Sequence, residues 1–344
     1  MSEKFYLKSD IIEICNNLKN YRKNFLGKRF LISGANGFLG KYFIKSLLEM
    51  NKNLKRKIKI LAVDIKFDSC EIFKDKNVNK LKQDINSINK IKFKSDYVLH
   101  AAGIPSPKHY YNKPIEAIFT SITGTKKLLE YSKKNKSKFI FFSSSEIYGN
   151  PDKKNIPTKE TYNGNVSCIE DRSCYDEGKR VGETLCYFYK IKQNVNVSIF
   201  RPFNVFGPGM PKNDYRVFPR FFYSIKKNKP ITIFKKGRQT RTFCYVTDAV
   251  TAMFLVIIKG NQFVYNIGNN GPEVNMSMLH KNIEKSIGKK VKSININYPK
   301  NYPQVEPQRR CPDISKIKKE LRYKARVSLS SSIRRFYFWS NKYY

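Results

Sequence analysis

The sequence has few of the residues from which metal sites and disulfide frameworks are built. Its 344 residues include three histidines and seven cysteines, and no two cysteines are spaced as Cys-x-x-Cys. An odd number of scattered cysteines argues against a disulfide framework and predicts reduced thiols. The histidines form no cluster with cysteines or carboxylates, so no metal site is predicted.

Long apolar runs are also missing. A membrane-spanning helix needs roughly 18–20 apolar residues, and the best candidate, Ala249 to Ile258, is about half that length, which predicts a buried helix. The first residues mix charges such as Glu3 and Lys4 with apolar residues, unlike the continuous apolar core of a signal peptide. We therefore predict a cytoplasmic protein with no membrane partner. Residues 9–26 are expected to form one amphipathic helix.

Acidic residues are scarce relative to basic ones. The chain has 67 Lys and Arg residues against 27 Asp and Glu residues, a formal net charge of +40. A nucleic-acid surface would gather its basic residues in one tract with interleaved aromatics, whereas the lysines here occur in every region. An excess of Lys, Asn and Ile is typical of AT-rich coding sequence, so we predict no nucleic-acid partner. A positive field would still attract an anionic nucleotide substrate.

The clearest positive feature is a glycine-spaced turn after an apolar strand. Residues 28–40 read KRFLISGANGFLG, in which the strand 30–32 is followed by Gly34, Gly37 and Gly40. In dinucleotide-binding folds, the first glycine permits the tight turn and the second lets backbone amides approach the pyrophosphate. The third lets the helix pack closely on the strand. Because residues 38–48 have apolar side chains at helical spacing, we predict a strand, a phosphate-binding turn and a helix.

The second strand, expected within residues 57–65, ends at Asp64. A carboxylate at this distance accepts hydrogen bonds from ribose hydroxyls and repels a 2′-phosphate, which favours NAD over NADP. Asp84 and Ile85 are expected beside the adenine. Small residues after the third expected strand, 97–99, let the backbone approach the cofactor. The predicted NAD-binding residues are Gly34, Asn36, Gly37, Phe38, Leu39, Gly40, Asp64, Asp84, Ile85, Ala101, Ala102, Gly103, Tyr175, Lys179 and Pro202.

Strand and helix patterns alternate from Phe30 to about Pro202, which predicts an α/β fold: a Rossmann-type doubly wound parallel sheet. Helices are expected at 118–132 and 172–192, and strands at 139–142 and 195–200. After Pro202 the pattern breaks into turns rich in Pro and Gly. We predict an N-terminal helical extension (1–27), an NAD-binding domain (28–203, with a returning segment at about 242–268) and a smaller α+β substrate domain (204–241 and 269–344). Residues 328–343 have the spacing of a terminal helix.

Two further motifs suggest catalysis. Tyr175 and Lys179 stand one helical turn apart, and an ammonium beside a phenol is expected to lower the tyrosine pKa. Such a tyrosine can remove a proton from a sugar hydroxyl while hydride leaves the same carbon. The strand 139–142 runs into Ser143-Ser144-Ser145-Glu146, at the sheet edge where ligands bind in doubly wound folds. Ser144 could donate to the same sugar oxygen, and Glu146 could act as a second acid or base.

These motifs resemble the extended short-chain dehydrogenase/reductase superfamily, also described as NAD-dependent epimerases and dehydratases. Within it the sequence is most similar to the UDP-glucuronate decarboxylases (UDP-xylose synthases). The resemblance rests on GxxGxxG at 34–40, SSEIYG at 144–149, SCYDEGKRV at 173–181, RPFNVFGP at 201–208, QTRTFCYVTD at 239–248 and RRCPDI at 309–314. It covers nearly the whole chain from about Gly27. Ser144 and Ser121 stand where that family usually has threonine and asparagine.

The resemblance implies a reaction and a set of residues. Tyr175 and Lys179, assisted by Ser144, would remove hydride from C4 of a glucuronosyl ring, so that the C6 carboxylate becomes a β-keto acid. Loss of CO₂, protonation at C5 and return of hydride to C4 would give UDP-xylose, with NAD recycled in each turnover. The implied catalytic residues are Ser144, Glu146, Tyr175 and Lys179, and the implied substrate-binding residues are Ser145, Glu146, Asn204, Arg216, Arg241 and Arg310.

Other activities stay open. A 4,6-dehydratase or a 4-epimerase acting on another nucleotide sugar is the main alternative. Dehydratases of this kind carry an Asp-Glu pair where this chain has Ser145 and Glu146, and epimerases usually lack the glutamate. A non-catalytic NAD-binding protein is disfavoured because it has no need of Ser144, Tyr175 and Lys179. Related enzymes pair through the helix that contains the catalytic tyrosine, so a homodimer is expected.

Overall fold

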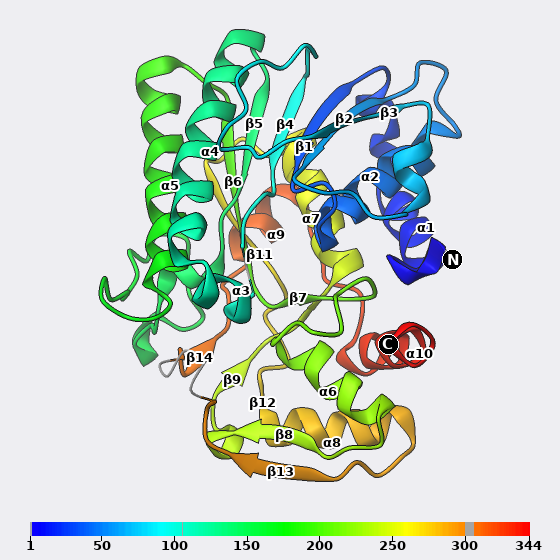
Figure 1. Cartoon of the computed structure of the whole chain (residues 1–344), viewed down its shortest axis with the longest axis vertical. Helices are drawn as coiled ribbons and strands as arrows, with labels where there is room; N and C mark the ends of the chain where they lie inside the picture. Colours follow the sequence, from blue (N-terminus) through cyan, green and yellow to red (C-terminus); the bar gives the residue numbers. More distant parts are fainter. Residues whose placement is uncertain (1, 105, 300–305) are drawn as a thin grey trace.

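A computed structural model of the chain describes residues 2–104, 106–299 and 306–344. Its larger part is a seven-stranded sheet with the strand order β11-β6-β5-β4-β1-β2-β3, covered by helices on both faces (Figure 1). Every neighbouring pair of strands in this sheet is parallel. The predicted Rossmann-type α/β fold is therefore confirmed.

The strands of this sheet are β1 (Arg29–Ser33), β2 (Lys59–Asp64), β3 (Val78–Lys82), β4 (Tyr97–His100), β5 (Lys138–Phe142), β6 (Val197–Pro202) and β11 (Val264–Ile267). The helices around it are α1 (Lys8–Asn17), α2 (Phe38–Asn51), α3 (Pro107–Asn112), α4 (Pro114–Asn135), α5 (Ser173–Gln193), α7 (Val246–Lys259) and α9 (Ser315–Leu321). The expected strand 97–99 is the fourth in chain order, since residues 78–82 form a strand that the sequence analysis did not predict.

The two faces of the sheet are filled by two separate apolar clusters. Phe30 and Ile32 of β1 pack with residues of α2 and α7, whereas Leu31 between them packs with residues of α4 and α5. Because neighbouring side chains of a strand point to opposite faces, a strand that is apolar throughout requires helices on both sides. Twelve of the fourteen residues of α7 are buried, including all of residues 249–257, as the apolar run in the sequence predicted.

The N-terminal segment packs against the helices of one face, and one prediction about it is wrong. Residues 9–26 do not form a single helix: α1 ends at Asn17, and a 3₁₀ helix follows at Lys19–Phe25. Leu18 between them has φ −104° and ψ 8°, outside the α-helical range. The break lets Leu18 and Phe25 both enter the core, where they are 1% and 0% exposed.

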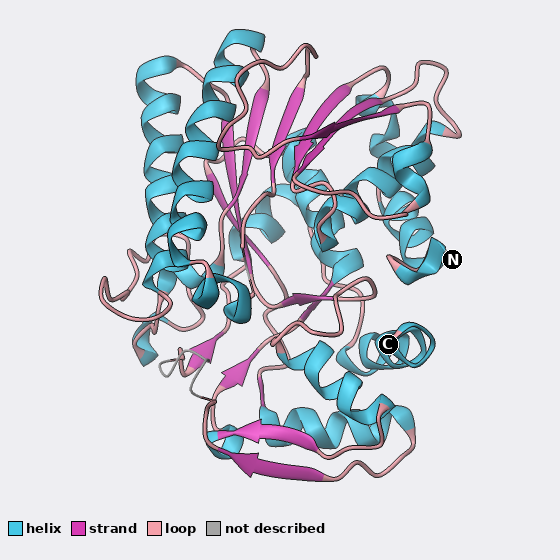
Figure 2. Cartoon of the chain, viewed as in Figure 1, coloured by secondary structure: helices cyan, strands magenta, loops and turns pink. Residues whose placement is uncertain are grey.

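The smaller part of the molecule faces the carboxyl ends of the parallel strands (Figures 1 and 2). It contains α6 (Val217–Lys226), α8 (Met276–Ile287), α10 (Leu329–Tyr343), β8 (Ile231–Phe234), β9 (Thr240–Arg241), β12 (Val274–Asn275), β13 (Ser293–Ile296) and β14 (Arg309–Arg310). β13 pairs with β8, and β9 lies between β12 and β14. A short pair of strands, β7 (Val205–Phe206) and β10 (Cys244–Tyr245), lies between the two parts.

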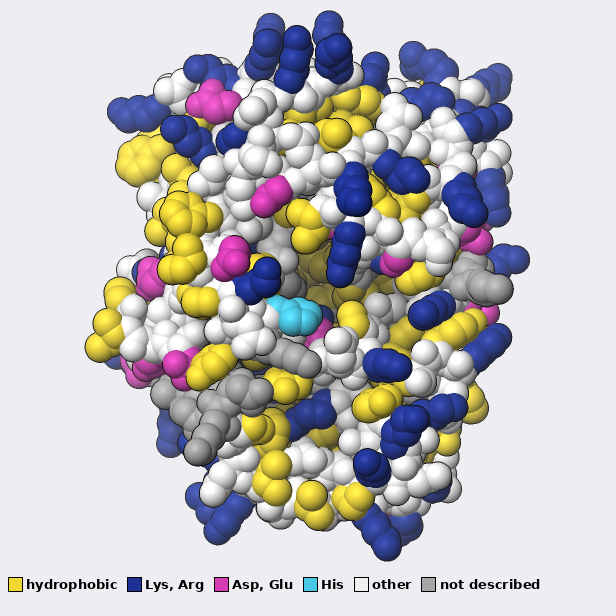
Figure 3. Space-filling model, viewed as in Figure 1, with side chains coloured by type: hydrophobic (Ala, Val, Ile, Leu, Met, Phe, Trp, Pro, Cys, Tyr) yellow, Lys and Arg dark blue, Asp and Glu magenta, His cyan; other side chains and the backbone are white. Residues whose placement is uncertain are grey.

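Two segments return from the smaller part to the large sheet. β11 pairs with β6, and α9 packs against α7 and β11. The carboxyl ends of the strands and the smaller part thus face one another across a hollow, which is visible in the middle of the space-filling view (Figure 3). Within the described residues, no helix combines the length and the apolar character needed to cross a membrane, and no group of metal-ligating side chains is found.

Candidate active site

The glycine turn has the geometry of a dinucleotide cradle. Gly34 has φ +70°, and a Cβ atom built on it would lie 2.6 Å from the backbone of Ala101 and Ala102. A Cβ on Gly40 would lie 2.4 Å from the Gly34 carbonyl oxygen, so this glycine is required for the close approach of α2. Gly37 is the N-cap of α2, and a Cβ there would have one neighbour within 4 Å, the Gly34 oxygen at 3.1 Å. The second glycine therefore leaves the helix N-terminus accessible to a phosphate.

Asp64 lies at the end of β2, beside this turn. Its Oδ2 accepts a hydrogen bond from the Asn36 amide at 2.9 Å, and its Oδ1 has a longer contact of 3.4 Å with the Lys66 amide. Burial raises the pKa of this carboxyl, although the surrounding amides oppose the effect. Phe38 and Leu39 form the first turn of α2. The residues present thus fit the phosphates and the adenosine ribose of NAD.

The remaining predicted cofactor residues lie at the same edge of the sheet. Ala101, Ala102 and Gly103 follow β4, and Pro202 ends β6. A Cβ on Gly103 would lie 3.4 Å from the Lys179 ammonium, so this backbone passes directly beside the Tyr–Lys pair. Asp84 and Ile85 follow β3, where the Asp84 carboxylate accepts a hydrogen bond from the Asn86 amide at 2.8 Å and the Ile85 side chain is 4% exposed.

Tyr175, Lys179 and Ser144 come together where β5 and the first turns of α5 meet. Lys179 Nζ donates a hydrogen bond to the Phe142 carbonyl at 2.8 Å and lies 5.8 Å from the centroid of the Tyr175 ring. Ser144 caps the 3₁₀ helix Ser145–Tyr148 by accepting a hydrogen bond from the Glu146 amide. The serine hydroxyl also interacts with the Tyr175 hydroxyl.

The expected lowering of the Tyr175 pKa is not found in this arrangement. The pKa of Tyr175 is raised, because burial outweighs the lowering effects of its hydrogen bond with Ser144 and of the Arg216 and Arg172 charges. Burial also lowers the pKa of Lys179 to about 8. Both shifts have one physical cause: the low-polarity surroundings disfavour the charged form of either group.

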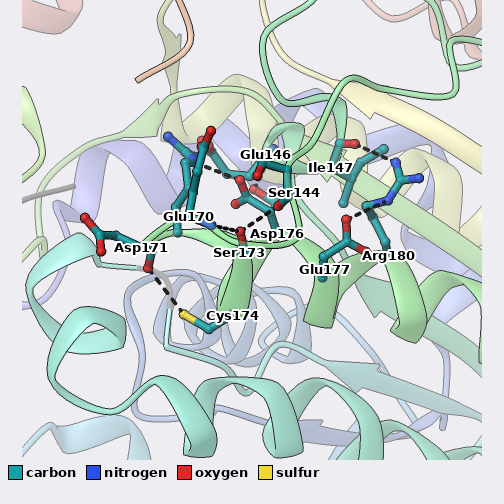
Figure 4. Close-up of polar contacts among 12 residues, drawn as sticks. Ser144, Glu146, Ile147, Glu170, Asp171, Ser173, Cys174, Asp176, Glu177 and Arg180 are labelled. Atoms are coloured by element: carbon teal, nitrogen blue, oxygen red, sulfur yellow. Dashed lines mark hydrogen bonds and ion pairs between the residues drawn. The ribbon is translucent and has the colours of Figure 1, made fainter. Parts of the chain in front are cut away.

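Glu146 lies in a cluster of buried charges at the N-terminal end of α5. Its Oε2 forms an ion pair with Arg310 Nη2 at 2.5 Å and a second ion pair with Arg172. Arg172 Nε in turn contacts Asp176 Oδ2 at 2.7 Å. Figure 4 shows Glu146, Ser144 and Asp176 lying together above the first turns of α5. We call Glu146, Arg172, Asp176 and Arg310 the carboxylate–arginine cluster.

The other predicted substrate residues come from both parts of the molecule: Arg241 and Arg216 belong to the smaller part, Asn204 lies between β6 and β7, and Ser145 follows β5. Arg241 pairs in register with Arg310 across β9 and β14 and contacts Glu306 Oε2 at 3.3 Å. Asn204 has φ +43°, and its side-chain amide donates to the Thr242 carbonyl at 2.8 Å. Arg216 forms a bidentate ion pair with Asp214, and the Arg216 charge favours the ionised form of Tyr175. Ser145 begins the 3₁₀ helix after β5 and is 4% exposed.

Sequence reasoning missed three residues of the site. The Tyr110 ring stacks on the Tyr175 ring at a centroid distance of 5.5 Å and an interplanar angle of 15°. Arg172 and Asp176 flank Tyr175 at an i, i+4 spacing, which was a usable signal because residues four apart share a helix face. Nothing in the sequence indicated Tyr110, since only the packing of α3 against α4 brings it to the tyrosine.

Similarity to known proteins agrees with this geometry. The model of the NAD dependent epimerase/dehydratase family matches residues 30–268. UDP-glucuronic acid decarboxylase 3 of Arabidopsis thaliana is 34% identical over 314 residues, which are 89% of this chain and 86% of that protein. UDP-glucuronic acid decarboxylase 1 of Xenopus tropicalis is 32% identical over 308 residues, covering 89% of this chain and 70% of that protein.

A solved structure has the same architecture. The chain superimposes on UDP-glucuronic acid 4-epimerase from Bacillus cereus, crystallised with UDP-glucuronic acid and NAD, with a TM-score of 0.76 and 27% identity. The superposition covers 92% of this chain and all of that one.

Proposed function

The chain belongs to the NAD dependent epimerase/dehydratase family, whose cofactor is NAD, and we propose that it converts UDP-glucuronate to UDP-xylose by decarboxylation. The observation that carries this proposal is the convergence of two guanidiniums, Arg172 and Arg310, on Glu146 at the start of the helix that contains Tyr175. Positive charge at this place suits a sugar that bears a carboxylate. The relatives named UDP-glucuronic acid decarboxylase, which match 89% of the chain, support the same substrate.

Tyr175 is the base that we propose for the C4 hydroxyl, assisted by Ser144. Bound NAD would supply the acceptor for the C4 hydride and later return that hydride. Because burial raises the pKa of Tyr175, the tyrosine needs neighbouring positive charge to lose its proton. Lys179 Nζ lies 5.8 Å from the centroid of its ring, and the Arg216 and Arg172 charges favour its ionised form. Lys179 is fixed for this role by its hydrogen bond to the Phe142 carbonyl.

Oxidation at C4 makes the C6 carboxylate a β-keto acid. Loss of CO₂ then leaves an enolate whose charge rests on the C4 oxygen, next to the Ser144 and Tyr175 hydroxyls. Donors that are already oriented at a developing oxyanion lower the barrier more than they stabilise the ground state. The remaining steps are protonation of C5 and reduction of C4.

Incubation of the purified protein with UDP-glucuronate, followed by mass spectrometry, tests the proposal. The expected result is a product lighter by one CO₂, and Tyr175→Phe is expected to abolish its formation while NAD stays bound. Loss of water from a UDP- or dTDP-hexose without CO₂ release would point to a dehydratase instead.

A 4-epimerase is the second candidate, because the superimposed solved structure is a UDP-glucuronic acid 4-epimerase. That activity would leave the mass of UDP-glucuronate unchanged and would produce UDP-galacturonate, which chromatography separates from the substrate.

We also propose a homodimer that forms through α4 and α5. These helices lie side by side (Figure 1), and hydrophobic side chains gather on the side of the molecule that they form (Figure 3). The exposed apolar residues are Ile115 (60%) and Phe119 (53%) on α4 and Val181 (39%), Tyr187 (47%), Phe188 (50%) and Ile191 (48%) on α5. Such patches mark interaction surfaces. Light scattering is expected to give a dimer for the natural chain and a monomer for Phe119→Glu/Phe188→Glu.

A further inference from the structure

Lys41 is a buried cation beside the phosphate turn, one position after the last of the three glycines. Its side chain is 8% exposed. Nζ donates a hydrogen bond to the Asn36 carbonyl within the turn and forms an ion pair with Asp68 Oδ2 at 2.8 Å. A buried ammonium is costly unless it is paired and hydrogen-bonded, so these partners hold the side chain in one place. Lys41 thereby joins the phosphate turn to the loop that follows β2.

Asn36 connects the same turn and loop through three further groups. Its amide donates to Asp64 Oδ2 at 2.9 Å, and its side-chain oxygen accepts a hydrogen bond from the Asp68 amide at 3.3 Å. The Lys41 charge also acts to lower the pKa of Asp64, against the larger effect of burial. The carboxylate that suits the adenosine ribose is therefore linked to Lys41 both by geometry and by charge.

The N-terminal segment provides another contact with this lysine. Nζ of Lys41 lies 5.0 Å from the centroid of the Phe5 ring, within the range of a cation–π interaction. Phe5 is held in turn by its neighbours, since a Cβ atom built on Gly209, in the loop after β7, would lie 2.2 Å from the Phe5 carbonyl oxygen. The Trp339 indole on α10 donates to the Glu3 carbonyl at 2.7 Å. We call Lys41, Asp68 and Phe5 the Lys41 cluster.

The next turn of α2 repeats this arrangement away from the phosphate turn. Lys45 Nζ lies 3.3 Å from Glu71 Oε1 and 5.5 Å from the centroid of the Tyr6 ring. Each lysine thus meets one aromatic ring of the N-terminal segment and one carboxylate that follows β2. Of the hydrogen bonds and ion pairs that these two lysines make with the described residues, only one, from Lys41, reaches the phosphate turn. Lys45 is therefore a matched control for Lys41.

We propose that the Lys41 cluster holds the phosphate turn in its NAD-binding shape and so slows the release of NAD. The pyrophosphate of NAD brings negative charge to the N-terminus of α2, close to the Asp64 and Asp68 carboxylates, and the Lys41 charge offsets part of the repulsion. The three residues are positioning residues, because they act through Asn36 and the loop after β2. The inference concerns the cofactor alone and goes beyond the proposed function, since it holds whichever sugar reaction is catalysed.

Exchange of the bound cofactor in Lys41→Met tests the inference. Methionine fills the space of the lysine stem, and Asp68, whose side chain is 33% exposed, can be hydrated when it loses its partner, so the variant should fold. The purified NAD-loaded protein is mixed with isotope-labelled NAD, and the exchange is followed by mass spectrometry. We expect NAD to leave about tenfold faster than from the natural chain, the lower end of what a hydrogen bond to a charged group contributes. The affinity for UDP, measured by calorimetry, should not change.

The variants of the neighbouring turn show whether the effect is specific. Lys45→Met should leave the exchange rate within about twofold, because Lys45 does not contact the phosphate turn. Phe5→Leu should speed exchange about two- to fivefold, as expected for a lost cation–π contact, whereas Tyr6→Phe in the same segment should not. An unchanged rate in Lys41→Met, an equal increase in Lys45→Met, or a UDP affinity that falls by the same factor would overturn the inference.

Discussion

Two buried carboxylates in this chain gather partners from distant segments, and they differ in how completely they are satisfied. Asp10 on α1 accepts hydrogen bonds from the Tyr42 and Tyr245 hydroxyls at 3.0 and 2.9 Å and forms an ion pair with Arg335 of α10 at 3.1 Å. We call these four residues the Asp10 cluster. In the described part of the chain none of its side chains has an unpartnered buried atom, whereas the carboxylate–arginine cluster has two.

This difference indicates that one cluster stabilises the fold and that the other serves the proposed site. The Asp10 cluster joins the first helix to the last and leaves no atom for a ligand, so its role is to hold the fold together. The carboxylate–arginine cluster lies between the sheet and the smaller part and leaves hydrogen-bonding capacity unused. Buried polar groups without partners are costly, and such groups at the centre of a proposed site are expected to be satisfied by the substrate.

The largest expected effect concerns activity at the incomplete cluster. Glu146→Gln keeps the shape of the side chain but cannot act as the second acid or base. We expect kcat for CO₂ release from UDP-glucuronate to fall by about 10²- to 10⁴-fold, the contribution of a general acid. Asp10→Asn is the matched control at the other cluster and should keep kcat within about twofold, since Asp10 touches no residue of the proposed site. Equal losses in the two variants would end the distinction between the clusters.

The next effect concerns stability. Arg172→Met leaves the Asp176 side chain, which is 2% exposed, without its ion-pair partner. Breaking a buried pair in this way is expected to lower the free energy of unfolding by about 3–5 kcal/mol, as measured by urea denaturation. Arg172→Met/Asp176→Asn should recover part of the loss because it removes the unpaired charge. A change in the single variant below about 1 kcal/mol would show that the pair is not a buried one in solution.

A smaller effect is expected at the Asp10 cluster. Tyr245→Phe removes a hydrogen bond to a buried carboxylate and should lower the free energy of unfolding by about 1.5–3 kcal/mol without changing kcat. Tyr337→Phe, at a half-buried ring of α10 that belongs to neither cluster, is the control and should change neither quantity. A loss of activity in Tyr245→Phe would contradict the structural role of this cluster.

The smallest expected effect is a pH dependence of the free energy of unfolding that arises from the ionisation of Asp10. Burial raises the pKa of Asp10 from 3.8 to about 6, so between these values the folded chain holds a proton that the unfolded chain has released. The contribution of Asp10 to the free energy of unfolding is therefore fully present below pH 3.8 and is lost as the pH rises through 6. Relative to Asp10→Asn, the natural chain should lose on the order of 2 kcal/mol between pH 4 and 7 in denaturant titrations. A difference in the free energy of unfolding between the natural chain and Asp10→Asn that stays constant with pH would contradict the raised pKa of Asp10.

The cofactor half could be predicted from the sequence because its signals are local. Gly34, Gly37 and Gly40 are needed for close backbone approach within one strand–turn–helix unit, and Asp64 stands at the end of the next strand. The Tyr175–Lys179 pair is likewise set by one turn of one helix. Periodicity and spacing along a continuous segment carry all of this information.

The carboxylate–arginine cluster could be predicted only in part. Arg310 and Glu146 are 164 positions apart in sequence, and their meeting depends on β14 joining β9 beside the end of β5. The resemblance named both residues but not their contact. Tyr110 gave no signal, since its stacking on Tyr175 depends on how α3 packs.

The sequence by itself determined the doubly wound sheet, the phosphate turn and the spacing of the tyrosine and lysine, because hydrogen bonding and side-chain periodicity act over neighbouring residues. The tertiary structure alone decided which charges meet and how far each is withdrawn from water. Burial depends on every segment that packs around a group, and for that reason the Tyr175 pKa moves opposite to the direction that its neighbouring lysine had suggested.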